Sequence, residues 1–293
     1  MRFLWTWLTG KTRAPSPDAI SPARPDAPIM RPPHLRRLDV EEFRYTEGVC
    51  EAYLLSGDTS IATLMAARAL LAERYPDHLI LCSLDDLDQA VYTSGHALES
   101  HGLVGDSDPQ NEPENRGNRT GIDTKVFEVR LKRFRAAMPT ASLADIEGVL
   151  PNFARDEDFT IFDANRTPDA ILDDQITLHI VPVKQPEELI AAFPNGYFLF
   201  DLNPFELAVM ARYLNSEFGL ALFGLGSAYI GFLSPAPLNE TMSARAAKRI
   251  SELFQTRHQD EVESFLDQHL QRSRFLFLAY VETSRNPKRS HNS

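Results

Sequence analysis

Residues 196–235 read GYFLFDLNPFELAVMARYLNSEFGLALFGLGSAYIGFLSP. The apolar spacing predicts a strand, a capped helix, a second strand, a tight turn and a third strand in succession. Asn203 suits the helix N-cap and Pro204 the first helical position, while the Glu206 carboxylate can return to the Asn203 N–H. Gly219 follows the last turn, where a left-handed residue commonly ends a helix.

Two features of this stretch also allow a chemical interpretation. Asp201 and Glu206 could form a carboxylate pair for acid–base catalysis or metal binding, although capping already explains Glu206. Residues 224–227, GLGS, suggest a phosphate cradle, but a dinucleotide fingerprint needs its third glycine at position 229, two before Gly231, and a helix after it. We therefore expect a hairpin turn at GLGS.

Residues 180–256 resemble a small bacterial domain of unknown function. The resemblance rests on a helix ending in YLNSEFG, the strand pair in LALFGLGSAYIGFLSPAP, and the alanine-rich helix ARAAKRISELF. Members of that family often carry Trp in the first helix, where this chain has Tyr213. The resemblance implies a bacterial origin and assigns no catalytic residue.

Composition places the chain among globular proteins and limits its partners. The 293 residues are 43% hydrophobic and 24% charged, with a net charge of −11. Residues 1–37 carry +5 and residues 281–293 carry +2, so the body between them carries −18. Such an acidic body argues against wrapping nucleic acid.

The organisation along the chain predicts an α+β fold, in which a mostly antiparallel sheet is covered by helices and preceded by a disordered N-terminal segment. Seven prolines within residues 14–33 indicate a linker. The domains that we expect are a basic, Pro-rich tail (1–37), an N-terminal α/β region (38–101), a flexible linker or loop (102–124), a C-terminal α+β domain (125–281) and a basic tail (282–293).

Further elements follow from apolar periodicity. Ser83 or Asp85 is expected to cap a short helix that runs through Val91. The pattern AR-x-L-x-x-E occurs in two predicted helices, with its arginine at Arg68 and at Arg212, and a predicted strand follows each time. This suggests either an internal repeat or chance convergence. The remaining expected elements are helices 61–75, 125–138, 186–192, 244–256 and 260–270, and strands 78–83, 158–163, 175–183 and 274–281.

Reactive side chains do not form a recognisable motif. His96 and His101 are five residues apart, whereas joint ligation of a metal from one helix favours four. His179 lies within a strand pattern, facing either the core or solvent. The catalytic candidates are Asp201, Glu206 and His96, and we expect neither a metal nor a cofactor.

The N-terminus carries a short apolar cluster that is too short for a signal sequence. It could anchor the chain weakly at a membrane surface, dock on its own domain or remain unstructured. Cys50 and Cys82 form no CxxC pair, which fits a reducing cytosol. The cluster consists of Phe3, Leu4, Trp5, Trp7 and Leu8.

Two classes of function remain open. The first is a non-catalytic bacterial cytosolic interaction protein, of the adaptor or toxin-neutralising type, whose partner is another protein and not nucleic acid. The second is an enzyme whose site lies between the two halves and pairs a carboxylate such as Asp201 with a histidine from the N-terminal half. The absence of catalytic motifs and the acidic body favour the interaction protein.

Overall fold

The structure of the chain is a computed structural model, which describes residues 34–39, 49–104, 124–150, 161–198, 201–254 and 258–281. The N-terminal aromatic cluster, the Pro-rich linker, most of the polar segment 102–124 and the basic tail 282–293 lie outside the described residues. The predictions made for them stay predictions. All of the described residues belong to one compact unit.

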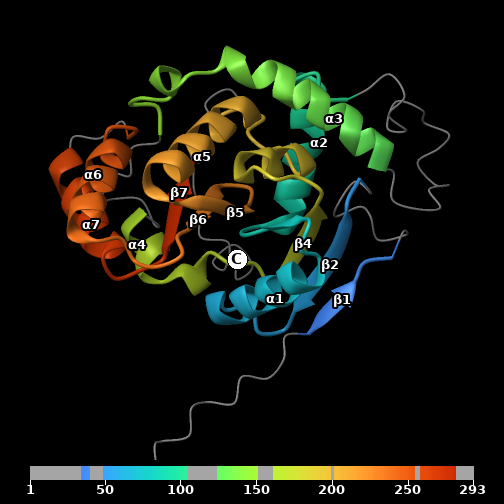
Figure 1. Cartoon of the computed structure of the whole chain (residues 1–293), viewed down its shortest axis with the longest axis horizontal. Coiled ribbons are helices and arrows are strands. Elements are labelled where there is room, and N and C mark those ends of the chain that lie inside the picture. Colours follow the sequence, from blue (N-terminus) through green and yellow to red (C-terminus); the bar gives the residue numbers. More distant parts are fainter. Residues whose placement is uncertain are drawn as a thin grey trace, which may run out of the picture. The chain divides into compact units, whose positions relative to one another are not determined.

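The α+β prediction is confirmed, because one seven-stranded, mostly antiparallel sheet carries the helices (Figure 1). The strand order is β1-β2-β4-β3-β5-β6-β7. Among the described strands of this sheet, only β3 and β5 pair in parallel, with Cys82 opposite Gly224. The strands are β1 (Leu35–Arg37), β2 (Glu51–Ser56), β3 (Leu79–Cys82), β4 (Gln175–Val181), β5 (Ala221–Leu225), β6 (Tyr229–Leu233) and β7 (Phe275–Ala279).

Strand β4, from the middle of the sequence, is inserted between β2 and β3 in this sheet. Strand β4 pairs with β2 through Tyr53 and Leu178, and with β3 through Leu81 and His179. The regions predicted on either side of residues 102–124 therefore contribute to a single sheet. The two helix–strand units of the possible repeat place their strands, β3 and β5, side by side at the parallel pair.

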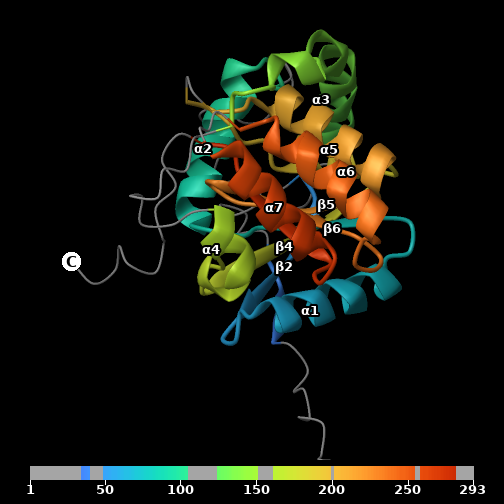
Figure 2. The same cartoon turned by 90° about the vertical axis from the view of Figure 1, so that its left-hand side faces the viewer.

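The helices pack around the sheet in the arrangement shown in Figures 1 and 2. Contacts join α1 to β3, α2 to β4, α4 to β7 and α5 to β5, while α6 packs against α7. Their bounds are α1 (Ile61–Arg74), α2 (Leu87–Ser100), α3 (Thr124–Ala137), α4 (Ile161–Arg166), α5 (Pro204–Phe218), α6 (Glu240–Ser251) and α7 (Gln259–Leu270). The short 3-10 helices are Met138–Thr140, Leu143–Asp145, Pro168–Ala170 and Pro186–Ala192.

Helix α5 begins and ends as predicted. The Asn203 side chain accepts from the N–H groups of Phe205 and Glu206, and the Glu206 carboxylate accepts from the Asn203 N–H at 2.8 Å. Gly219 ends the helix with a φ of 69°. Strands β5 and β6 form the predicted hairpin, but residues 226–228 connect them, because Gly224 and Leu225 of GLGS still pair within β5.

Because the cap serves two otherwise unpaired N–H groups, we expect Asn203→Ala to lower the free energy of unfolding by about 1 kcal/mol. Chemical denaturation measures this loss, and partner binding should survive it. Unchanged stability together with lost binding would show that Asn203 belongs to a site rather than to a cap.

Three local predictions are wrong. Residues 196–198 and 201–203 form no strand, because Gly196 has a φ of +91° and the Asp201 carboxylate accepts from the Phe198 N–H, which closes a turn. The predicted strand 158–163 is helical where it is described, since α4 starts at Ile161. Helix α2 is capped by Asp86 and extends to Ser100, because Asp85 is directed elsewhere.

Candidate functional site

Helix α2 places two ring-bearing side chains on one exposed face. Tyr92 and His96 are one helical turn apart, so they lie above one another. Their ring centroids are 4.5 Å apart with the planes at 72°, an edge-to-face contact. Apolar residues on the opposite side of the helix, among them Ala90, Ala97 and Leu98, are fully buried and fix the helix on the sheet.

The segment that follows the 3-10 helix Pro186–Ala192 is tied to α2 by buried hydrogen bonds. The Asn195 side chain is fully buried, accepts from the Thr93 hydroxyl and donates to the Ala90 carbonyl at 3.1 Å. A ring nitrogen of His101 lies 3.3 Å from the Gly196 carbonyl oxygen. Residues 195–196 are therefore held against the helix, and the side chains that follow are directed from a fixed base.

Tyr197 and Phe198 extend the pair on α2 into a row of four rings. The Tyr197 ring stacks on His96, with centroids 4.8 Å apart and an interplanar angle of 26°, and Phe198 follows at 5.3 Å. We call Tyr92, His96, Tyr197 and Phe198 the aromatic surface. Contacts of this kind stabilise the arrangement beyond the area that they bury.

The aromatic surface is open to solvent. Tyr92 is 58% exposed, Phe198 52% and Tyr197 37%. The other large exposed apolar side chains of the described residues, Leu70, Val129 and Val149, belong to separate elements. Isolated exposed apolar residues are normal on protein surfaces, whereas a contiguous group marks an interaction site.

The sequence candidates lie around this surface, but the structure gives them capping and packing roles. His96 is part of the aromatic surface itself. Asp201 accepts from the Phe198 N–H at 3.2 Å and Glu206 completes the α5 cap. Burial raises the pKa of Glu206, and the nearby Asp145 charge raises it further. The hydrogen bond from the Asn203 N–H and the charge of His101 lower this pKa and so offset part of the rise.

Asp85 has a role that the sequence pattern did not reveal. It follows β3, is 3% exposed, and accepts from the Ser227 hydroxyl at 2.7 Å and from the N–H groups of Ala228 at 2.9 Å and Tyr229 at 3.1 Å. Burial raises its pKa to about 6 against these three hydrogen bonds. Its carboxylate thus joins the β3–α2 connection to the β5–β6 turn.

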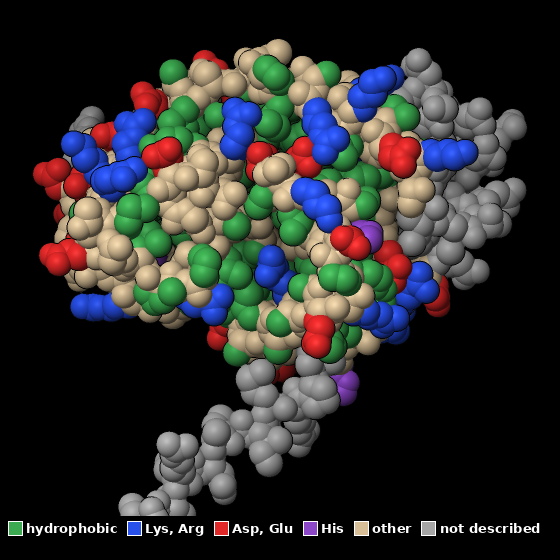
Figure 3. Space-filling model, viewed as in Figure 1, with side chains coloured by type: hydrophobic (Ala, Val, Ile, Leu, Met, Phe, Trp, Pro, Cys, Tyr) green, Lys and Arg blue, Asp and Glu red, His purple; other side chains and the backbone are tan. Residues whose placement is uncertain are grey.

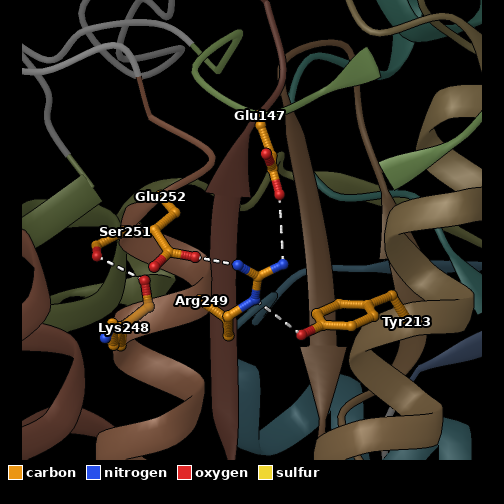
Figure 4. Close-up of polar contacts among 6 residues, drawn as sticks. All are labelled: Glu147, Tyr213, Lys248, Arg249, Ser251 and Glu252. Atoms are coloured by element: carbon orange, nitrogen blue, oxygen red, sulfur yellow. Dashed lines mark hydrogen bonds and ion pairs between the residues drawn. The ribbon is translucent and has the colours of Figure 1, made fainter. Parts of the chain in front are cut away.

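Arg249 on α6 forms the centre of a second polar cluster (Figure 4). Its guanidinium donates to the Tyr213 hydroxyl at 3.1 Å, to Glu147 at 3.3 Å and to Glu252. Two carboxylates already face this cation, so the cluster connects α5, α6 and the segment before Leu150 rather than offering an anion site.

The basic side chains of helix α3 are partly paired within the fold. Arg135 makes a two-point ion pair with Glu188, at 2.6 and 2.9 Å, and Arg133 donates to the carbonyls of Gly102 and Val104. Acidic and basic side chains are interspersed on the face shown in Figure 3, which does not display one large basic field.

Other predicted positions are buried. His179 is fully buried, its Nε2 lies 3.0 Å from the Thr177 hydroxyl, and burial lowers its pKa to about 4. Cys50 and Cys82 are buried free thiols, and burial raises the pKa of each to about 12. Within the described residues, no three His, Cys, Asp or Glu side chains gather as metal ligands, and no helix could span a membrane.

Comparison of the chain with protein-family models, characterised proteins and solved structures finds no match.

Proposed function

We propose that this chain is a non-catalytic interaction protein that binds another protein through the aromatic surface. The observation that carries the proposal is a row of four contiguous rings on a rigid base, of which Tyr92, Tyr197 and Phe198 are exposed. Tyrosine is enriched among the residues that dominate binding energy, because a large amphipathic ring is ordered at little entropic cost.

The surroundings of the surface support binding rather than catalysis. The Asp201 and Glu206 carboxylates accept backbone N–H groups, which accounts for their positions without a reaction. The buried thiols of Cys50 and Cys82 are compatible with a reducing cytosol, which we propose as the compartment. The adaptor and toxin-neutralising roles both remain within this proposal.

We expect the double variant Tyr92→Ala/Phe198→Ala to lose at least about tenfold in partner binding, because removing central aromatic contacts commonly costs that much. The measurement is quantitative capture of proteins from an extract of the source cells by the full-length chain. Thermal unfolding should change little, since both side chains are largely exposed.

The matched control is Leu70→Ala/Val129→Ala, which removes two exposed apolar side chains at 52% and 37% exposure on other helices. It should capture the same partners as the wild type. If both double variants capture equally, the aromatic surface is not the binding site.

A further inference from the structure

We propose that the basic C-terminal segment, residues 282–293, binds the aromatic surface of its own chain. This inference rests on the proposed function and deepens it, because it assigns the ligand chemistry: Lys and Arg side chains laid on aromatic rings between carboxylates. A partner would then carry a similar basic segment and would compete with the tail.

Carboxylates flank the aromatic surface. On α2, exposed Asp88 lies one turn before Tyr92, and exposed Glu99 lies one turn after His96. Neither residues 86–101 nor residues 195–206 contain Lys or Arg. Arg133 reaches the end of α2, where its donors are directed at the Gly102 and Val104 carbonyls.

Aromatic rings beside carboxylates select cationic side chains. A guanidinium or ammonium group is attracted to the face of a ring, and Arg stacks on such faces while its N–H groups reach a carboxylate. Four rings with acidic residues at both ends of the helix therefore suit a segment that carries several Lys or Arg residues. An acidic or purely apolar segment would leave these carboxylates without a complementary charge.

The described chain ends beside this surface. The Tyr280 carbonyl accepts from the Leu202 N–H at 3.0 Å, and the Gly196 backbone packs against the Leu202 carbonyl directly before Tyr197. The Tyr280 N–H donates to Ala228 at 3.0 Å, within the turn that Asp85 holds next to the start of α2. The described chain, which ends at Val281, is thus hydrogen-bonded at Tyr280 to a residue close to each of the two segments that build the aromatic surface.

The segment that leaves there has the complementary charge. Residues 282–293, ETSRNPKRSHNS, contain Arg285, Lys288 and Arg289 against a single acid, Glu282. Residues 105–123, which also adjoin α2 in the sequence, carry a net charge of −3 and would be repelled. Of these two segments, only residues 282–293 therefore carry a charge that complements the carboxylates beside the aromatic surface.

The tether makes a weak contact sufficient. The 12 residues reach at most about 40 Å when extended. A short flexible connection gives an effective concentration on the order of millimolar, so a millimolar intrinsic affinity already occupies the surface about half the time. A partner with several-fold higher affinity would displace the tail.

The first test is zero-length carbodiimide crosslinking of the dilute full-length chain, followed by peptide mass spectrometry. We expect Lys288 to crosslink with Asp88 or Glu99, and the yield to fall at 1 M salt, where charges are screened beyond about 3 Å. Crosslinks from Lys11 in place of Lys288 would assign the surface to the N-terminal segment and overturn the proposal, as would the absence of either.

The second test measures binding in trans. The full chain with Arg285→Glu, Lys288→Glu and Arg289→Glu is titrated with a labelled peptide of residues 282–293, and fluorescence anisotropy reports the affinity. Binding should be at least threefold tighter than to the wild type, whose own tail competes. Adding Tyr92→Ala/Phe198→Ala should abolish binding, and adding Leu70→Ala/Val129→Ala should preserve it.

Failure of this inference differs from failure of the proposed function. If the peptide does not bind while partner capture still requires Tyr92 and Phe198, the tail proposal alone is wrong. If partner capture is also independent of these rings, the aromatic surface is not an interaction site.

Discussion

Replacing Asp85 by alanine is expected to lower the free energy of unfolding by about 3 kcal/mol. The substitution leaves two buried N–H groups, those of Ala228 and Tyr229, without the carboxylate that they reach at 2.9 and 3.1 Å. Each unsatisfied buried donor costs about 1–3 kcal/mol. Relief of the cost of burying the charged carboxylate offsets part of this loss.

The neighbouring Asp86 provides the matched control. It is exposed and caps α2 by accepting from the Gln89 N–H at 3.1 Å, so Asp86→Ala should cost about 1 kcal/mol. Equilibrium denaturation of both variants gives the comparison. Equal losses would mean that the Asp85 carboxylate contributes no more than an ordinary cap and does not hold the β5–β6 turn.

Because the pKa of Asp85 is raised in the folded state, the free energy of unfolding depends on pH, and the direction of this dependence can be worked out. Its folded-state pKa of about 6 exceeds the ordinary aspartate pKa of 3.8, because burial disfavours the charged form. Between these values the folded state binds the extra proton, so the stabilising contribution is complete below the unfolded pKa and is lost as pH rises through about 6. The Asp85→Asn variant lacks this contribution.

The free energies of unfolding of wild type and Asp85→Asn at pH 5 and pH 7 therefore isolate the effect, because the other carboxyls titrate in both proteins. The stability of the wild type relative to the variant should be higher at pH 5 than at pH 7. A difference of the opposite sign would show that the hydrogen bonds from Ser227, Ala228 and Tyr229 outweigh burial.

Local signals predicted both ends of helix α5, because a cap depends on residues close in sequence. Asn203, Glu206 and Gly219 specify both ends of α5 within 17 residues, and the structure shows each in its expected role. The insertion of β4 between β2 and β3 had no such signal. Leu81 pairs with His179, almost 100 residues further along the chain. The alternation of apolar residues predicts that a segment is a strand, but not which strand it pairs with.

The aromatic surface was missed for the same reason. Residues 196–200, GYFLF, have the composition of a buried strand, and only the turn closed by Asp201 and the bonds of Asn195 to α2 direct Tyr197 and Phe198 outward. Tyr92 joins them from 105 positions earlier in the chain. Composition led us to expect an interaction protein, but the surface that we propose for binding is formed by tertiary contacts.

Gly196→Ala is expected to cost at least about 3 kcal/mol and to impair the aromatic surface at the same time. A Cβ at this position would lie 1.8 Å from the Leu202 carbonyl oxygen and 2.8 Å from its carbon, so backbone rather than a flexible side chain must move. The φ of +91° adds left-handed strain of about 1–2 kcal/mol. Displacing residue 196 also moves Tyr197 away from His96.

The variant Gly57→Ala distinguishes the cost of backbone strain from the cost of a steric clash. Gly57 has nearly the same φ, +94°, but nothing lies within 4 Å of the position that its Cβ would take, so only the conformational cost of about 1–2 kcal/mol remains. Chemical denaturation should give a much lower free energy of unfolding for Gly196→Ala than for Gly57→Ala. Under conditions where both variants stay folded, only Gly196→Ala should lose partner capture. If the two variants behaved alike, the close packing of Gly196 on Leu202 would not determine where Tyr197 and Phe198 are displayed, and the rigid base of the aromatic surface would have to lie in the Asn195 bonds alone.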